Sequence, residues 1–261
     1  MQSHLNLLFQ EKNKMEIIKK NKWKIWNKKK NVEFRTFKRT QKKLPEMESS
    51  KQLIKILKPL YKFNYRIMDV GCASGHYYHS VKKLNKNIKY LGVDATKEYI
   101  NFGRKYFKNN NNVILKNLSI YDLHKSKLKY DIVYSCNVIL HLPELKKALQ
   151  NLLSVAKKYV LIRTLISDYS SITKKLITDK IDKRGDPLDY VYQNTWSRKY
   201  IKSICQNYKI RFIKDKFSEK NINTEYKNWK SKQGKDITFS TKGTQISGSK
   251  VFEWEWILIK K

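Results

Sequence analysis

Short apolar segments alternate with amphipathic segments between residues 66 and 163, and this alternation constrains the fold more than any other feature of the sequence. The short segments have the length of strands and cover residues 66–70, 88–94, 113–116, 131–135 and 159–163. The segments between them carry apolar residues at three- and four-residue spacing and predict helices over 75–84, 97–107 and 143–155. Strands separated by helices predict an α/β domain with a parallel sheet.

Residues 1–43 precede this domain, and we expect them to form a basic arm with helical pieces, which leaves 44–261 as one domain. The arm combines Lys and Asn with aromatic side chains at Trp23, Trp26, Phe34 and Phe37. Docking of these aromatics onto the domain is the favoured interpretation. Contact with a nucleic acid or a membrane surface is the alternative.

The cofactor half of the domain is expected over 66–166, and the substrate half, with a lid and the C-terminal strands, over 167–261. In the second half we expect a helix near 197–205 and two antiparallel strands near 210–217 and 251–259. The polar composition of 218–250 predicts a loop or an excursion rather than core.

Charge is the most prominent feature of the composition, because 57 basic residues against 22 acidic ones give a net charge of +35. Such a charge attracts phosphate backbones and anionic membranes. However, the basic residues are spread along the chain and are mostly Lys, without the Arg clusters that favour bidentate phosphate contacts. A solvated surface is therefore favoured over a specific polyanion contact, which stays open.

The apolar runs and the cysteine spacing of the sequence predict the cellular compartment and the state of the cysteines. No apolar run approaches the ~18 residues of a membrane span, and the N-terminus lacks the pattern of a signal peptide, so we expect a cytoplasmic protein. The spacing of Cys72, Cys136 and Cys205 predicts neither a disulfide framework nor a zinc site. We therefore expect buried thiols and no metal.

The first predicted strand leads into a loop of small residues, DVGCASG, at 69–75. Small side chains let backbone amides approach a ligand, and the helix expected near Gly75 would point its positive end into the same space. A dinucleotide loop needs Gly-x-Gly-x-x-Gly, but Ala73 and His76 stand at two of the glycine positions. Asp69 would repel a pyrophosphate and attract the ammonium and sulfonium groups of S-adenosylmethionine. The loop therefore favours S-adenosylmethionine over a dinucleotide.

Four segments in register resemble the class I S-adenosylmethionine-dependent methyltransferases, especially the type 11 and type 12 methyltransferase families. They are RIMDVGCASGH at 66–76, YLGVD at 90–94, SIYDL at 119–123 and YDIVYSCNVILHL at 130–142. The resemblance implies a Rossmann-like α/β fold, with a mostly parallel seven-stranded sheet, helices on both faces and an antiparallel C-terminal strand. It also implies S-adenosylmethionine as the cofactor and methyl transfer as the reaction.

The same resemblance assigns the cofactor contacts. The loop would line the methionine part, Asp94 would accept the ribose hydroxyls, and Asp122, flanked by Tyr121, would accept from the adenine amine. The cofactor-binding residues predicted in this way are Asp69, Gly71, Ala73, Gly75, Asp94, Tyr121, Asp122, Cys136 and Asn137. Ala73 departs from the family, which more often has Gly there. Purely structural roles are the alternative for the three aspartates.

A general base is needed only if the acceptor must lose a proton, and His141 is the candidate because it follows the fourth strand. His76 and His79, after the glycine loop, are weaker candidates, and packing is the alternative for all three. Aromatic side chains could wall the acceptor pocket or belong to the core; they are Tyr77, Tyr78, Tyr190, Tyr192 and Trp196.

Three functions remain open from the sequence. A small-molecule or sugar acceptor is favoured. An RNA acceptor fits the charge and the arm, but residues 135–138 read SCNV where base-amine methyltransferases have Asn-Pro-Pro-Tyr, and Cys136 is not in a Pro-Cys pair. A binding module that has lost its chemistry is the third possibility. The sequence does not predict the oligomeric state.

Overall fold

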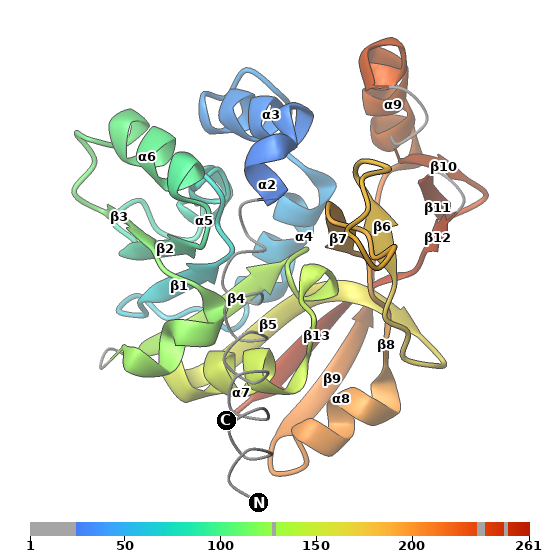
Figure 1. Cartoon of the computed structure of the whole chain (residues 1–261). Coiled ribbons are helices and arrows are strands. Elements are labelled where there is room, and N and C mark those ends of the chain that lie inside the picture. Colours follow the sequence, from blue (N-terminus) through green and yellow to red (C-terminus); the bar gives the residue numbers. More distant parts are fainter. Residues whose placement is uncertain (1–24, 127–128, 234–237, 248–249) are drawn as a thin grey trace, which may run out of the picture.

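A computed structural model describes residues 25–126, 129–233, 238–247 and 250–261 of the chain (Figure 1). Its central sheet follows the order β3-β2-β1-β4-β5-β13-β9, and β8 pairs with the end of β5. The strands of this sheet are β1 (Ile67–Val70), β2 (Tyr90–Asp94), β3 (Val113–Asn117), β4 (Tyr130–Cys136), β5 (Ala156–Ser167), β8 (Trp196–Ser197), β9 (Lys209–Lys214) and β13 (Trp254–Lys260).

The direction of the strands confirms the predicted architecture. Strands β1 to β5 pair in parallel with their neighbours, whereas β13 is antiparallel to both β5 and β9. The strand order reverses between β1 and β4, and this switch leaves a crevice beyond the carboxyl ends of the strands. The sheet therefore places a ligand site at the edge where the glycine loop lies.

Helices cover both faces of the sheet, as the alternation predicts (Figure 1). Strand side chains alternate between the two faces, so that Met68 and Val70 join one buried core while Ile67 joins the other. Three helices pack into the core that contains Ile67: α4 (Glu48–Leu57), α5 (Tyr78–Val81) and α6 (Lys97–Tyr106). Four pack into the core that contains Met68: the α-helices α7 (Lys146–Val155) and α8 (Arg198–Ile204), and the 3-10 helices η2 (Ile120–Lys125) and η3 (Ile139–His141).

The helix after the glycine loop is shorter than predicted. Regular helix covers only α5, and turns replace it over 74–77 and 82–84. Gly75 has φ +83°, a backbone conformation that a right-handed helix excludes, so the helix cannot begin there.

Three further groups of elements stand above the carboxyl edge of the sheet (Figure 1). They are α2 (Ile25–Lys28) with α3 (Lys30–Thr40), the hairpin of β6 (Lys174–Leu176) and β7 (Tyr190–Tyr192), and α9 (Glu219–Gln233) with the antiparallel strands β10 (Phe239–Thr241), β11 (Thr244–Ser247) and β12 (Lys250–Phe252). The segment 218–250 is thus an excursion with its own helix and small sheet, and the strand expected at 251–259 is divided between β12 and β13.

The arm packs onto the domain through α3. Phe37 stacks on Phe102 of α6, with ring centroids 3.8 Å apart and an interplanar angle of 3°. The hydroxyl of Thr40 lies 2.6 Å from that of Ser74, in the glycine loop. The structure thus confirms the docking interpretation for Phe37, whereas Phe34 is 47% exposed and Trp23 lies outside the described residues.

The three cysteines are free and buried, as predicted. No described helix combines the length and the apolar character that crossing a membrane requires.

Candidate active site

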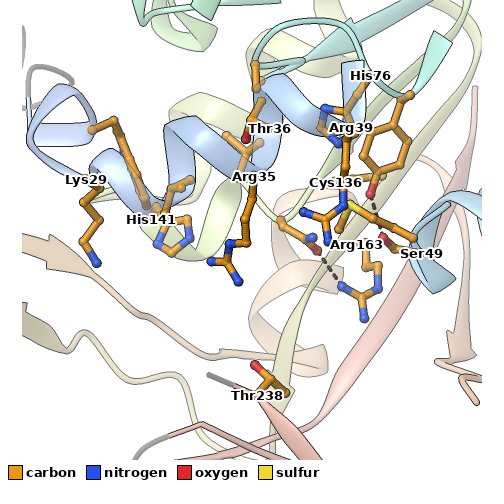
Figure 2. A pocket seen from close by; sticks show the side chains of 18 of the residues that line it. Lys29, Arg35, Thr36, Arg39, Ser49, His76, Cys136, His141, Arg163 and Thr238 are labelled. Atoms are coloured by element: carbon orange, nitrogen blue, oxygen red, sulfur yellow. Dashed lines mark hydrogen bonds between the residues drawn. The ribbon is translucent and has the colours of Figure 1, made fainter. Parts of the chain in front are cut away.

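A cavity of about 1010 Å³ lies at the carboxyl edge of the sheet (Figure 2). Residues that follow β1, β2, β3 and β4 form its floor, and residues of α3, the β6–β7 hairpin and the excursion form its roof. Single-ligand pockets usually have about 300–1,000 Å³. The cavity therefore has room for a cofactor and an acceptor together.

The glycine loop forms one part of the floor. Gly71 has φ +80°, and a Cβ atom at this position would lie 2.2 Å from Cγ2 of Val138. The amide nitrogens of Gly71 and Cys72 donate to the carbonyl of Val93, at 2.7 Å and 3.0 Å, and so tie the loop to the end of β2. Residue 71 therefore has to be glycine, because the loop packs directly against Val138, and Gly71 and Ala73 present backbone to the cavity.

Asp94, at the end of β2, lies beside this loop and lines the cavity. Its Oδ2 accepts a hydrogen bond from the amide of Ala73 at 2.8 Å, and its Oδ1 accepts one from the amide of Thr96 at 2.8 Å. Burial raises the pKa of this carboxyl group. Each oxygen has further acceptor capacity, so the carboxylate can hold a ligand hydroxyl while the backbone fixes its position.

Asp69 has a different environment, because it is only 2% exposed and lies within β1, between β2 and β4. Its Oδ2 accepts hydrogen bonds from the hydroxyls of Tyr90 at 2.6 Å and Tyr134 at 3.0 Å. Burial raises the pKa of this carboxyl group to about 7, against the effect of the two hydroxyls. Neither Asp69 nor Gly75 is among the described residues that line the cavity.

Residues 118–120, directly after β3, line the cavity, whereas Tyr121 and Asp122 do not. Asp122 pairs with Lys125 at 2.7 Å, and the hydroxyl of Tyr121 donates to the carbonyl of Glu144 at 3.2 Å. The adenine contact expected at Tyr121 and Asp122 stays a prediction, and Ser119 is a cavity residue that this prediction did not include. The signal for Ser119 is its position, since residues that directly follow a parallel strand face the crevice.

Cys136 and Asn137, after β4, line the cavity as expected. Asn137 has φ +61°, and its side-chain oxygen accepts a hydrogen bond from Nη1 of Arg163 at 2.6 Å. Arg163 also donates to both oxygens of Asp215, at 2.9 Å and 2.8 Å, and lies over the ring of Trp254. This buried ion pair could not be predicted from the sequence, because Arg163 lies in β5 and Asp215, 52 residues later, directly follows β9.

His141, in η3, lines the cavity and contacts the edge of the Trp26 ring. Its Nδ1 lies 2.6 Å from the carbonyl oxygen of Tyr192, which can only accept, so Nδ1 carries the proton and Nε2 has a free lone pair. Burial lowers the pKa of this imidazole to about 4. His141 is therefore neutral at pH 7 and can accept a proton at Nε2.

The other histidine candidates differ in position. His76 lines the cavity, its Nδ1 is buried without a partner among the described residues, and burial lowers its pKa to about 3. His79 does not line the cavity, and its Nε2 lies 2.7 Å from the carbonyl of Thr40.

The predicted aromatic wall is only partly present. Tyr77 lines the cavity, with its hydroxyl 2.7 Å from that of Ser49. Tyr78 and Trp196 are buried in the two cores, and the cavity residues of the β6–β7 hairpin region include Val191 and Gln193 rather than the tyrosines at 190 and 192.

A family model described as a methyltransferase domain matches residues 62–237, which is more than half of the chain. The chain belongs to this methyltransferase family. The match confirms the class I S-adenosylmethionine-dependent methyltransferases that the four motifs indicated, together with S-adenosylmethionine as the cofactor and methyl transfer as the activity. The curated proteins, in contrast, include no match to the sequence.

Solved structures of similar fold include three with low sequence identity to the methyltransferase. Coclaurine N-methyltransferase, bound to N-methylheliamine and SAH, has 11% identity and a TM-score of 0.56, and the match covers 81% of this chain and 71% of that one. The YcgJ protein from Bacillus subtilis has 16% identity and a TM-score of 0.52, with 82% and 97% covered. TehB from Haemophilus influenzae has 15% identity and a TM-score of 0.49, with 83% of this chain but only 62% of TehB covered. At these identities the likeness concerns the fold.

Proposed function

We propose that the methyltransferase transfers a methyl group to a small-molecule or sugar acceptor that is enclosed in the cavity. The observation that carries this proposal is the roof over the carboxyl edge of the sheet, which α3, the β6–β7 hairpin and the excursion build together. A cavity of about 1010 Å³ that has a roof and stays partly open to solvent suits a small acceptor that enters between floor and roof. Coclaurine N-methyltransferase, of similar fold, holds the small molecule N-methylheliamine.

For the cofactor, we propose that the loop at Gly71 and Ala73 holds the methionine part and that Asp94 accepts the ribose hydroxyls. The close approach of the loop to Val138 and the two anchored oxygens of Asp94 support these roles. Cys136 and Asn137 would face the methionine end. The adenine side is the wall at 118–120, beside which Asp122 lies.

S-adenosylmethionine supplies a methyl group on a sulfonium, and a neutral thioether leaves in an in-line displacement. The residues of the chain then have to align the acceptor and exclude water. Arg163, fixed by Asp215 and Asn137, gives the floor below the acceptor a rigid shape. If the acceptor loses a proton, Nε2 of His141 takes it, because the carbonyl of Tyr192 keeps the other ring nitrogen protonated.

RNA is the second candidate acceptor, and the net charge of +35 is the observation that favours it. The two candidates are separated by methyl transfer from a labelled donor to filtered small molecules of a cell extract and, separately, to total RNA. We expect the label in the low-mass fraction. Label in RNA, lost steeply with added salt, would overturn the small-molecule proposal.

A further inference from the structure

The described residues that line the cavity include more positively charged side chains than carboxylates. Each carboxylate on its lining is already engaged, by an ion pair or by backbone amides. These five carboxylates belong to Glu46, Glu48, Asp94, Asp215 and Glu225. A further cation on the lining can therefore only share one of these carboxylates, and a negative ligand would complete its compensation.

Arg35, on α3, is such a cation. Its side chain extends from α3 into the open space of the cavity, between those of His141 and Arg39 (Figure 2). Within the described residues, its guanidinium group has neither a hydrogen bond nor an ion pair. Burial, and then the charge of Arg39, lower the pKa of Arg35, and the charge of Glu225 raises it in part, but an arginine remains protonated at pH 7. Glu225 is the ion-pair partner of Arg39, so the half-buried guanidinium of Arg35 has only part of this charge to offset its own and would be stabilised by an anion.

Arg39 lies one helical turn further along α3 and also lines the cavity. It pairs with Glu225 through Nη2, while its Nε is buried without a partner among the described residues. The whole fork of Arg35 is therefore available, and Arg39 adds a positive charge on the same face of the helix. Guanidinium forks of this kind match the oxygen atoms of carboxylates and phosphates.

We propose that Arg35, supported by the charge of the neighbouring Arg39, binds a carboxylate or phosphate group of the methyl acceptor. The inference rests on the proposed function, since it names the chemical class of the enclosed acceptor. Arg35 shares its side of the cavity with His141, so the anionic group would hold the acceptor close to the candidate base (Figure 2). Both arginines lie outside the residues 62–237 that the family model matches, so this anion site is a feature of the arm of this chain.

The test is calorimetry on the full chain saturated with S-adenosylhomocysteine. This compound fills the donor site, including the place that the carboxylate group of the donor would take. Inorganic phosphate and acetate are then titrated separately, to distinguish a phosphate group from a carboxylate. We expect one of the two ions to bind, and Arg35→Gln to weaken that binding about tenfold or more. Lys38→Gln is the matched control, because it removes a charge from the same helix outside the cavity lining. It should bind the ion as the unmodified chain does.

The affinity for S-adenosylhomocysteine separates this inference from its alternatives. We expect Arg35→Gln to keep that affinity. If Arg35→Gln instead weakens S-adenosylhomocysteine binding and leaves ion binding intact, Arg35 holds the carboxylate of the donor and the inference is wrong. It is equally wrong if neither ion binds the unmodified, S-adenosylhomocysteine-saturated chain. Failure of S-adenosylhomocysteine to bind the unmodified chain would instead contradict the proposed function itself.

Discussion

Ala73 has a backbone conformation that favours glycine. Its φ of +49° lies in the left-handed region, where a non-glycine residue is strained by about 1 kcal/mol or more. Here the hydrogen bond from the amide of Ala73 to Asp94 holds the strained conformation in place.

Ala73→Gly should therefore stabilise the protein by about 1 kcal/mol, because Gly relieves the left-handed strain. Urea denaturation of the two chains measures the difference in the free energy of unfolding. A clear loss of stability in the glycine variant would show that Ala73 is not strained in the folded protein.

His141 gives a prediction on pH. Its pKa is about 4 in the folded protein and about 6.5 in the unfolded chain, so the unfolded chain binds a proton first as the pH falls. The contribution of His141 to stability is thus complete above pH 6.5 and is lost between pH 6.5 and 4.

His141→Gln should flatten the dependence of stability on pH across this window, as thermal denaturation at pH 4.5 and at pH 7.5 would show.

The same variant should lower turnover and leave the affinity for the cofactor unchanged, if His141 is the base. A variant with full turnover at every pH would remove His141 from the mechanism.

At the scale of elements, the docking of α3 determines whether the cavity has a roof on that side. Phe37 stacks on Phe102, whereas Phe34, on the same helix, is 47% exposed. Phe37→Ala should lower the free energy of unfolding by about 2 kcal/mol, and the matched control Phe34→Ala by less than about 0.5 kcal/mol. Urea denaturation of both variants tests this, and equal losses would contradict the docking of α3 through Phe37.

The sequence predicts the strands of the parallel sheet well, because β1, β2 and β4 are buried apolar runs with a clear length signal. It does not predict β6, β7, β10 and β11, whose strands of three or four residues are too short and too polar for a detectable alternation. It overestimates the helix after the loop, because the left-handed backbone of Gly75 has no signature in apolar spacing.

The candidate site could likewise be predicted only in part from the sequence. The contacts expected at Gly71, Ala73 and Asp94 follow from motifs within one βα unit, and these residues line the cavity. The surroundings of the acceptor depend on pairs such as Arg163–Asp215, which are distant in the sequence. Arg35 is equally hidden, since in the sequence it is one basic residue in an arm that is rich in them.

At the scale of the whole molecule, the chain consists of the methyltransferase domain that the family model matches and of segments outside that match. The floor of the cavity belongs to the family domain over 62–237, while α3 and the strands β10 to β12 lie outside that range and contribute to the roof. In the proposed function, this division separates the donor from the acceptor. The floor would hold the donor, and the roof, with Arg35, would select the acceptor.

Binding of the donor at Asp94 is tested by calorimetric titration of the purified methyltransferase with S-adenosylmethionine and, separately, with NAD, repeated on Asp94→Ala. We expect S-adenosylmethionine to bind and NAD not to bind, and we expect Asp94→Ala to weaken the binding by about 1–3 kcal/mol by leaving the ribose hydroxyls poorly paired. Circular dichroism shows whether the variant is folded. Binding of NAD in place of S-adenosylmethionine would show that the donor site is wrongly identified, and unchanged affinity in a folded Asp94→Ala variant would show that Asp94 does not hold the ribose.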